Sequence, residues 1–340
     1  METAATGTST VEVRELDRTD RQAVHRFWEV SVAAVAERPY AFPSPWEAAW
    51  LVISTERPDL GMILLGGYID GEMWGAASIA LPRHDNTHQA WLELEVHPDR
   101  RRQRLGSALL ERAEEVARRE GRRLFLAEVF TPPGESSAGL EFARASGFTV
   151  GLETEAKVAD LPETEHLWQP LAEQVAPHMD GYRLVSFQDG MPDELIEGYC
   201  LLAESFLEEA PVGEVEWERE RWDPQRVREH EDTMRRTHRK EFGTIAVGPD
   251  GEVAGFTELR VNLHDTSRAF QGGTLVHPGH RGHRLGLALK LANHRAVRAA
   301  HPDLRLVVTG NAGVNAHMNA VNDMLGFKVV ERCIEMQRPV

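Results

Sequence analysis

The sequence predicts a mixed α/β protein built from two copies of one domain. A stretch from Val96 to Leu110 recurs as Val276 to Lys290, and both copies contain His-Pro, several basic residues and Leu-Gly. An Asp-Gly-Glu turn that begins at residue 70 and a Gly-Phe pair at residue 147 recur 180 and 179 positions later. Three landmarks at a nearly constant offset indicate an internal repeat. We therefore expect a disordered tail over residues 1–10, one domain over 11–165 and a second over 175–340.

Composition limits the class of protein. A chain of 340 residues is long enough for two domains, and its 41% hydrophobic and 27% charged residues are typical of soluble proteins. We find no apolar run long enough to span a membrane and no signal peptide, so we expect a cytoplasmic protein with Cys200 and Cys333 as free thiols. The net charge of −16 disfavours nucleic-acid and membrane partners. It is compatible with a cationic substrate or with solubility alone.

The first half alternates short strands and helices. Alternating residues over 11–16 predict a strand, and apolar spacing over 17–37 predicts a helix. Three prolines make 38–45 irregular, and a second helix is expected over 46–53. The remaining expected elements are strands over 62–69 and 73–81 joined at Asp70-Gly71, a strand over 89–96, a helix over 107–120, a strand over 123–130, a helix over 138–145 and a strand opened by Gly147-Phe148.

The second half repeats this order. Its first strand is expected over 182–187 and its first helix over 194–208. The segment 217–240 is rich in Glu, Arg and His, which predicts a long solvated helix. Each half then contains antiparallel strands, a strand-to-helix turn and a final strand–helix–strand group.

The repeated stretch is predicted to bind an anion. Each copy follows a strand and leads into a helix, so its basic, Gly-containing turn places free backbone N–H groups at the positive end of that helix. A phosphate or pyrophosphate is the natural ligand of such a turn.

The two turns resemble the signature of the GNAT superfamily of N-acetyltransferases, Arg-x-x-Gly-x-Gly/Ala at a helix start. The first copy is Arg101-Arg-Gln-Arg-Leu-Gly106, and the second is Arg281-Gly-His-Arg-Leu-Gly286. A later family element, Asn-x-x-Ala-x-x-x-Tyr-x-x-x-Gly-Phe, is approached by residues 315–327 and only by a degraded version before Phe148. The chain looks most like the tandem type, with two GNAT-like domains. The resemblance implies that each is a mixed, mostly antiparallel, splayed sheet flanked by helices.

The resemblance implies acetyl-CoA as the acyl donor, and we expect no metal. It implies that the pantetheine chain adds to the sheet beside a bulge next to Val96 or Val276, and that the pyrophosphate contacts the amides of the turns. The residues expected to bind the cofactor are Val96, Arg101, Arg102, Gln103, Arg104, Leu105, Gly106 and Ser107, and Val276, Arg281, Gly282, His283, Arg284, Leu285, Gly286, Leu287 and Asn315.

Both turns depart from the signature at one position. The middle glycine is Arg104 in the first copy and Arg284 in the second. Their backbone N–H groups can still hold a phosphate if the local dihedral angles suit a residue with a Cβ. The guanidinium groups could also reach a phosphate themselves.

Acetyl transfer to an amine needs a base, because a lysine-like amine with a pKa of about 10.4 is protonated at neutral pH. Glu93 and Glu95 are the best candidates, with Glu93 slightly ahead, since both lie on one face of the strand that leads into the first turn. The equivalent residues of the second half are Gly273 and Leu275. Glu258, on the preceding strand, is a weaker candidate there.

The proton donor to the leaving thiolate is less well defined. The Tyr that serves this purpose in the family is replaced by Asn322 in the second half and by Ala143 in the first. We include Asn322 among the candidate catalytic residues, although an amide can only donate a hydrogen bond.

Two arrangements remain open. Either the first half catalyses and the second is structural, which we slightly favour, or the second half binds acetyl-CoA and the base comes from the first half or from water. The leading function is acetyl transfer from acetyl-CoA to a primary amine of a small molecule, by direct attack in a ternary complex, in a monomer or homodimer. The alternatives are acetylation of a protein or peptide amine, and a non-catalytic acyl-CoA-binding module, which the missing Tyr suggests.

Overall fold

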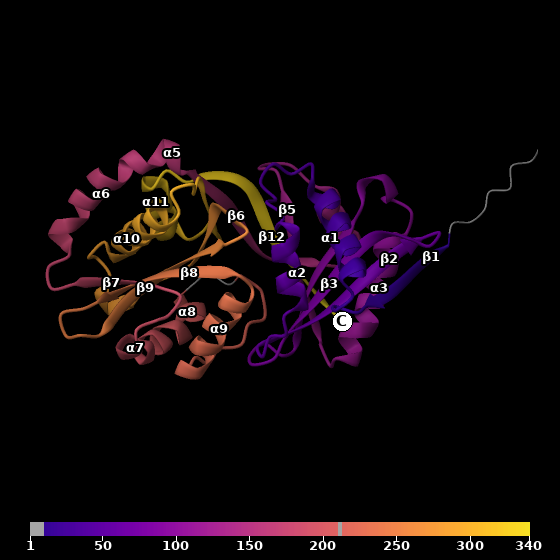
Figure 1. Ribbon diagram of the computed structural model, residues 1–340, viewed down its shortest axis with the longest axis horizontal. Coiled ribbons are helices and arrows are strands. Elements are labelled where there is room, and N and C mark those ends of the chain that lie inside the picture. The colour runs from indigo at the N-terminus through magenta and orange to yellow at the C-terminus, as the bar shows by residue number, and fades with distance from the viewer. Residues whose placement is uncertain (1–9, 210–212) are drawn as a thin grey trace, which may run out of the picture. The chain divides into compact units, whose positions relative to one another are not determined.

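The computed structural model describes residues 10–209 and 213–340, which form two compact units (Figure 1). Unit 1 contains the residues up to Glu128 together with Gln337–Val340, and unit 2 contains Val129–Met336. Residues 1–9 of the expected tail lie outside the described residues. Thr10 is tied to the first hairpin, because its N–H donates to Asp70 Oδ1 at 3.0 Å. The bounds 11–165 and 175–340 describe the repeat in the sequence and stay a prediction.

The strands of unit 1 follow the order β1-β2-β3-β4-β5. The pairs from β1 to β4 are antiparallel, and β4 pairs with β5 in parallel. The elements are β1 Val11–Leu16, α1 Arg21–Val35, α2 Trp46–Ser54, β2 Leu60–Ile69, β3 Glu72–Pro82, β4 Gln89–Val96, α3 Leu105–Arg119 and β5 Leu124–Thr131.

Helices α1 and α3 cover opposite faces of this sheet. Successive side chains of a strand point to opposite faces. Leu64 and Ala76 pack in a core cluster with three residues of α1, namely Val24, Phe27 and Val30. A Cβ added at Gly67 or Gly75 would instead meet Leu105 and Leu109 of α3.

Unit 2 has the strand order β12-β6-β11-β10-β9-β8-β7. The pairs from β7 to β10 are antiparallel, β10 and β11 are parallel, and β11 and β6 are antiparallel. The elements are α4 Ala138–Ala145, β6 Thr149–Asp160, α5 Leu161–Thr164, α6 Trp168–Val175, β7 Arg183–Gln188, α7 Asp193–Glu204, α8 Phe206–Glu209, α9 Pro224–Arg236, β8 Arg239–Val247, β9 Val253–Asn262, β10 Asp265–Val276, α10 Leu285–Ala300, β11 Leu306–Ala312, α11 Ala316–Met324 and β12 Lys328–Pro339.

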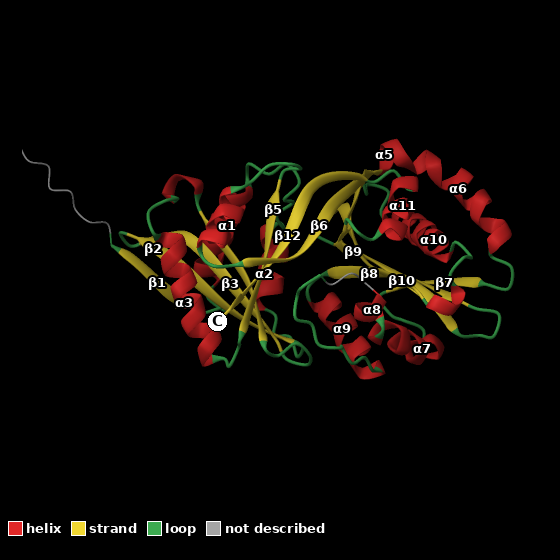
Figure 2. Ribbon diagram, turned by 180° about the vertical axis from the view of Figure 1, so that it is seen from behind, coloured by secondary structure: helices red, strands yellow, loops and turns green. Residues whose placement is uncertain are grey.

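The sheet of unit 2 also lies between two helical layers. Helices α10 and α11 lie on one face, and α7, α8 and α9 lie on the other (Figures 1 and 2). One apolar cluster packs α10 against the sheet and includes Leu291, and the other packs α7 against it and includes Leu195. Strand β6 comes from the first half of the sequence, but it pairs with β11, where Lys157 lies opposite Thr309.

Most expected elements are present, but two helices differ from expectation. The helix expected over 194–208 ends at Glu204, and the short α8 follows it. The expectation of a helix throughout 217–240 is wrong, because only Pro224–Arg236 is helical. Asp223 fixes the start of α9 by accepting a hydrogen bond from the Arg226 N–H at 2.8 Å, with Pro224 in the first turn.

Two further sequence-based expectations concern the cysteines and the helices. Cys200 and Cys333 are buried free thiols, as predicted. Within the part of the chain that the structure describes, no helix has both the length and the apolar character needed to cross a membrane.

Candidate functional site

In each unit, the two parallel strands pair only at their start and then diverge. β4 and β5 pair from Gln89 to Trp91, although β4 continues to Val96. β10 and β11 pair from Arg268 to Phe270, although β10 continues to Val276. The strand edges beyond the last pair carry backbone groups that an extended ligand can bind. Both units therefore contain a splay next to the basic turn.

The strand that leads into the turn is bulged in unit 2. The register between β9 and β10 shifts between Gln271 and Thr274. Gln271 Nε2 donates to the backbone carbonyl oxygen of Glu258 at 2.6 Å. A side-chain amide thus supplies the hydrogen bond that the bulge denies to this backbone carbonyl. The structure describes every residue of β3 and β4. Their register does not shift between the Gly75–Val96 pair and the Ala80–Trp91 pair. The bulge expected beside Val96 is therefore absent, and that of unit 2 lies before Thr274 rather than at Val276.

Each turn adopts left-handed backbone angles at two equivalent positions. The φ angle is 63° at Arg102 and 67° at Arg104, and it is 89° at Gly282 and 53° at Arg284. A residue with a Cβ adopts this conformation at a cost of roughly 1–2 kcal/mol. Arginine thus takes the backbone shape that glycine usually supplies. In both copies, the residue that replaces the middle glycine of the signature therefore adopts the left-handed backbone angles that a glycine would supply.

The backbone N–H groups of both turns are free. The first helical hydrogen bond of α3 runs from Ala108 N to Arg104 O at 3.0 Å, and that of α10 from Ala288 N to Arg284 O at 3.1 Å. Among the described residues, none accepts a hydrogen bond from the N–H groups of 102–107 or 282–287. Free amides at a positive helix end are suited to a phosphate.

The first arginine of each signature fixes its turn in place. Arg101 donates to Ala34 O at the end of α1 at 2.9 Å and to Val96 O at 3.3 Å. Arg281 forms an ion pair with Glu209 of α8 at 2.5 Å. These two guanidinium groups are therefore engaged within the protein.

The other predicted cofactor residues of the two turns divide into three groups. Three leucines in the first helical turns have buried side chains and offer only backbone to a ligand, and these are Leu105, Leu285 and Leu287. Exposed side chains or backbone are found at Arg102, Gln103, Arg104, Ser107, Gly282, His283 and Arg284. Gly106 and Gly286 belong to the first turns of α3 and α10.

Glu93 and Glu95 lie on the α1 face of β4, opposite Ser78 and Ala76. Glu93 Oε2 accepts a hydrogen bond from Ser78 Oγ at 3.2 Å. Burial raises the pKa of Glu95 to about 7, against a hydrogen bond from Ser31 that lowers it, and the charge of Glu93 raises it further. A carboxylate with this pKa is suited to general base catalysis near neutral pH.

A third carboxylate of unit 1, Glu128, was not among the sequence-based candidates. It lies on β5, two residues beyond the last β4–β5 pair. Burial raises its pKa, and the negative charge of Glu93 adds to this effect. Extending the parallel register of β4 and β5 by two residues would have placed Glu128 beside Glu93, but that register cannot be read from the sequence alone.

In unit 2, asparagines of the later family element cap α11 and hold a buried lysine. Asn315 Oδ1 caps α11 by accepting from the Met318 N–H at 3.1 Å. Asn322 is buried, and its Oδ1 accepts from Lys290 Nζ at 2.6 Å while its Nδ2 donates to Asn311 Oδ1 at 2.9 Å. Both ends of the Asn322 amide are occupied, so it holds Lys290 in this conformation.

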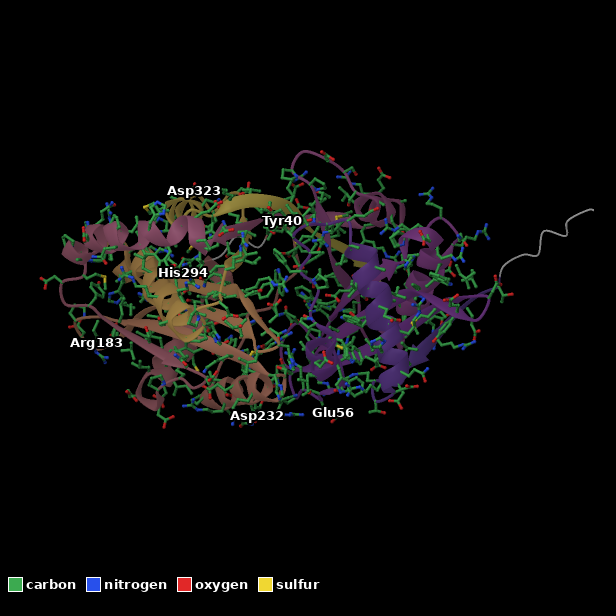
Figure 3. All side chains as sticks on the ribbon, turned by 45° about the horizontal axis from the view of Figure 1, so that its top comes forward. Tyr40, Glu56, Arg183, Asp232, His294 and Asp323 are labelled. Atoms are coloured by element: carbon green, nitrogen blue, oxygen red, sulfur yellow. The ribbon has the colours of Figure 1, made fainter. Side chains whose placement is uncertain are left out.

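Lys290 is a buried cation that sequence reasoning also missed. Its side chain is 1% exposed, and the described residues place no carboxylate in an ion pair with it. Burial lowers its pKa to about 7, with a smaller contribution from Lys157. His294, further along α10 and labelled in Figure 3, is also buried, and its pKa is lowered to about 3. The described residues contain no cluster of His, Cys, Asp and Glu arranged for a metal ion.

The comparisons with known proteins agree with this geometry. The model of the "Acetyltransferase (GNAT) family" matches residues 25–148 and 203–316. A tandem GNAT protein from the clavulanic acid biosynthesis pathway is 29% identical with a TM-score of 0.81, and the match covers 97% of this chain and 98% of that one. A GCN5-related N-acetyltransferase from Sphaerobacter thermophilus is 15% identical with a TM-score of 0.67, covering 97% and 95%. A search of curated proteins finds no match.

Proposed function

Since the chain belongs to the acetyltransferase (GNAT) family as a tandem of two domains, and is thereby an acyl-CoA-dependent acyltransferase, we propose that it transfers an acetyl group from acetyl-CoA to a primary amine of a small molecule. The observation that carries this proposal is the combination, in each unit, of a strand splay with a turn of free amides. The splay offers backbone groups to a pantetheine chain, and the turn offers N–H groups to a pyrophosphate.

We assign the base of unit 1 to Glu95, with Glu93 as its neighbour. Glu95 lies on β4 beyond the last β4–β5 pair, and its pKa of about 7 allows it to accept a proton near neutral pH. An amine of pKa about 10.4 must lose a proton before it attacks the thioester. Arg38 lowers the pKa of Glu95, so part of the carboxylate population stays ionised.

A small-molecule acceptor is supported by two observations. The similar tandem protein belongs to a pathway that makes a small molecule. The carboxylates at the splay of unit 1, Glu93, Glu95 and Glu128, favour an acceptor that arrives as a cation.

The second candidate is a non-catalytic acyl-CoA-binding module. It is favoured by Asn322, which stands in place of the family Tyr and is buried with both ends of its amide hydrogen-bonded. A free thiol assay separates the two functions. Acetyl-CoA is incubated with the protein and a panel of amino sugars, polyamines and amino acids, and release of CoA thiol is followed. We expect amine-dependent release. Binding of acetyl-CoA without release in any mixture would favour the binding module.

A further inference from the structure

The two sheets carry a carboxylate at the same cross-strand position, but on different strands. In unit 1, Glu93 on β4 lies opposite Ser78 on β3. At the positions 180 residues later, Glu258 on β9 replaces Ser78, and Gly273 on β10 replaces Glu93. Unit 2 therefore carries an acid in this strand pair, but on the neighbouring strand.

The bulge of β10 places the side chain of Glu258 against the backbone of a glycine. A Cβ added at Gly272 would lie 3.5 Å from Glu258 Oε2, and one added at Gly273 would lie 3.2 Å from the Phe256 ring and 3.3 Å from the Phe206 ring. Both glycines thus face the same side of the sheet, as expected where a bulge sets two residues against one. Tyr199 and Phe206 come from α7 and α8, so this side is the α7 face.

The two oxygens of Glu258 have different surroundings. Oε1 accepts a hydrogen bond from Tyr199 Oη at 2.6 Å. Oε2 lies 3.7 Å from Arg260 Nη2, beyond hydrogen-bond distance. The side chain retains 12% exposure. Burial raises the pKa of Glu258, and the charge of Glu241 adds to this effect. Oε2 is therefore the oxygen free to accept a proton.

We propose that unit 2 is a second acyl-transfer centre, in which Glu258 accepts the proton of a primary amine beside the β10 bulge. The proposal rests on the proposed function. The amine arrives as an ammonium group and gives one proton to Glu258 Oε2, and the neutral nitrogen then forms a C–N bond to the acyl carbon. The C–S bond of the thioester breaks, the nitrogen loses its second proton to water, and the CoA thiolate takes a proton from water. Glu258 then returns its proton to solvent.

A neighbouring carboxylate supplies a matched control. Glu241 Oε2 lies 3.0 Å from His230 Nε2 and 3.3 Å from Arg260 Nε, and these partners lower its pKa. Glu241 pairs with Arg260 across β8 and β9 and lies away from the bulge. Glu241→Gln keeps the proposed base but removes a charge that raises the pKa of Glu258, so it should shift the pH dependence of unit 2 to lower pH and leave the base in place.

The test compares amine-dependent thiol release by the wild type and by Glu95→Gln, Glu258→Gln, Glu241→Gln and the Glu95→Gln/Glu258→Gln double variant. We expect Glu95→Gln to retain turnover at a lower rate than the wild type. The double variant should be slower than Glu95→Gln by about 100-fold or more, the range for loss of a general base. Glu241→Gln should retain activity. Calorimetry with acetyl-CoA should give unchanged stoichiometry for Glu258→Gln, which shows that the folded site persists, because glutamine keeps an oxygen for Tyr199.

Each other outcome is decisive. Equal rates for Glu95→Gln and the double variant, or complete loss of turnover in Glu95→Gln alone, overturn the second centre and leave the proposed function intact. Turnover lost only in Glu258→Gln supports the second centre and removes the base assignment of unit 1. No thiol release by the wild type with any amine overturns the proposed function and the second centre together.

Discussion

Arg104 and Arg284, 180 positions apart, both adopt left-handed backbone angles immediately before the first residue of α3 and α10. The strain at this position is common to both turns, whereas the other left-handed position carries a Cβ only in the first turn, as Arg102, and is Gly282 in the second. The repeat has therefore preserved the backbone shape of the turn through a change of residue type.

This strain gives a first prediction. The free energy of unfolding of Arg104→Gly should exceed that of Arg104→Ala by roughly 1 kcal/mol. Both variants lose the guanidinium, but only alanine keeps the cost of a Cβ at positive φ. Urea denaturation of the two variants measures the difference. Equal stabilities would mean that the turn relaxes when the arginine is removed.

The pH dependence of turnover follows from Glu95. A base must be ionised, so the rate attributed to unit 1 should rise with pH through about 7, where Glu95 loses its proton. The profile of kcat/KM in the Glu258→Gln background isolates this unit. A rise of kcat/KM centred on the ordinary glutamate pKa of about 4.3 would show that Glu95 is not the base.

Glu95 should also destabilise the fold at higher pH. Its pKa is raised from 4.5 in the unfolded chain to about 7 in the folded one, so the native state binds more protons between these values and stability falls as pH rises. Glu95→Gln should therefore be more stable than the wild type at pH 8, by on the order of 1–3 kcal/mol. The gain should vanish towards pH 4.5. Thermal unfolding across this range checks the sign, and a constant difference would be inconsistent with a titrating Glu95.

Lys290 should act in the opposite direction. Its pKa is lowered from 10.5 to about 7 on folding, so the unfolded chain binds more protons between these values and native stability rises with pH. The stability of the wild type relative to Lys290→Met should rise between pH 7 and 9, by up to about 1.4 kcal/mol per pH unit. Denaturant titrations of both proteins at three pH values measure this change. A pH-independent difference would show that Lys290 is charged throughout.

The sequence predicts the repeated architecture because its signals are local. Asp70-Gly71 and the two basic turns have fixed positions relative to their strands and helices, so the hairpin and both helix starts follow from residue type. The expectation of a long helix over 217–240 failed because charged residues are common both in solvated helices and in loops. Asp223 followed by Pro224 was the available start signal.

The candidate site was harder to predict because it depends on pairing between distant strands. Glu258 and Gly272 face each other only through the register and bulge of β9 and β10. Glu128 comes close enough to Glu93 to feel its charge only because β4 and β5 pair in parallel over the residues that precede them. Lys290 meets Asn322 through the packing of α10 and α11. None of these relationships is encoded in spacing along one segment.

Calorimetric titration of acetyl-CoA into the wild type, Arg104→Glu and Arg284→Glu tests most directly whether both turns hold the donor. Both substitutions place a negative charge at an exposed, left-handed position directly before a helix start, so they are matched. We predict a stoichiometry near two for the wild type and near one for each variant. A stoichiometry near one that a single variant abolishes would make the other unit a scaffold and contradict a second centre. No binding to the wild type would contradict acyl transfer from acetyl-CoA altogether.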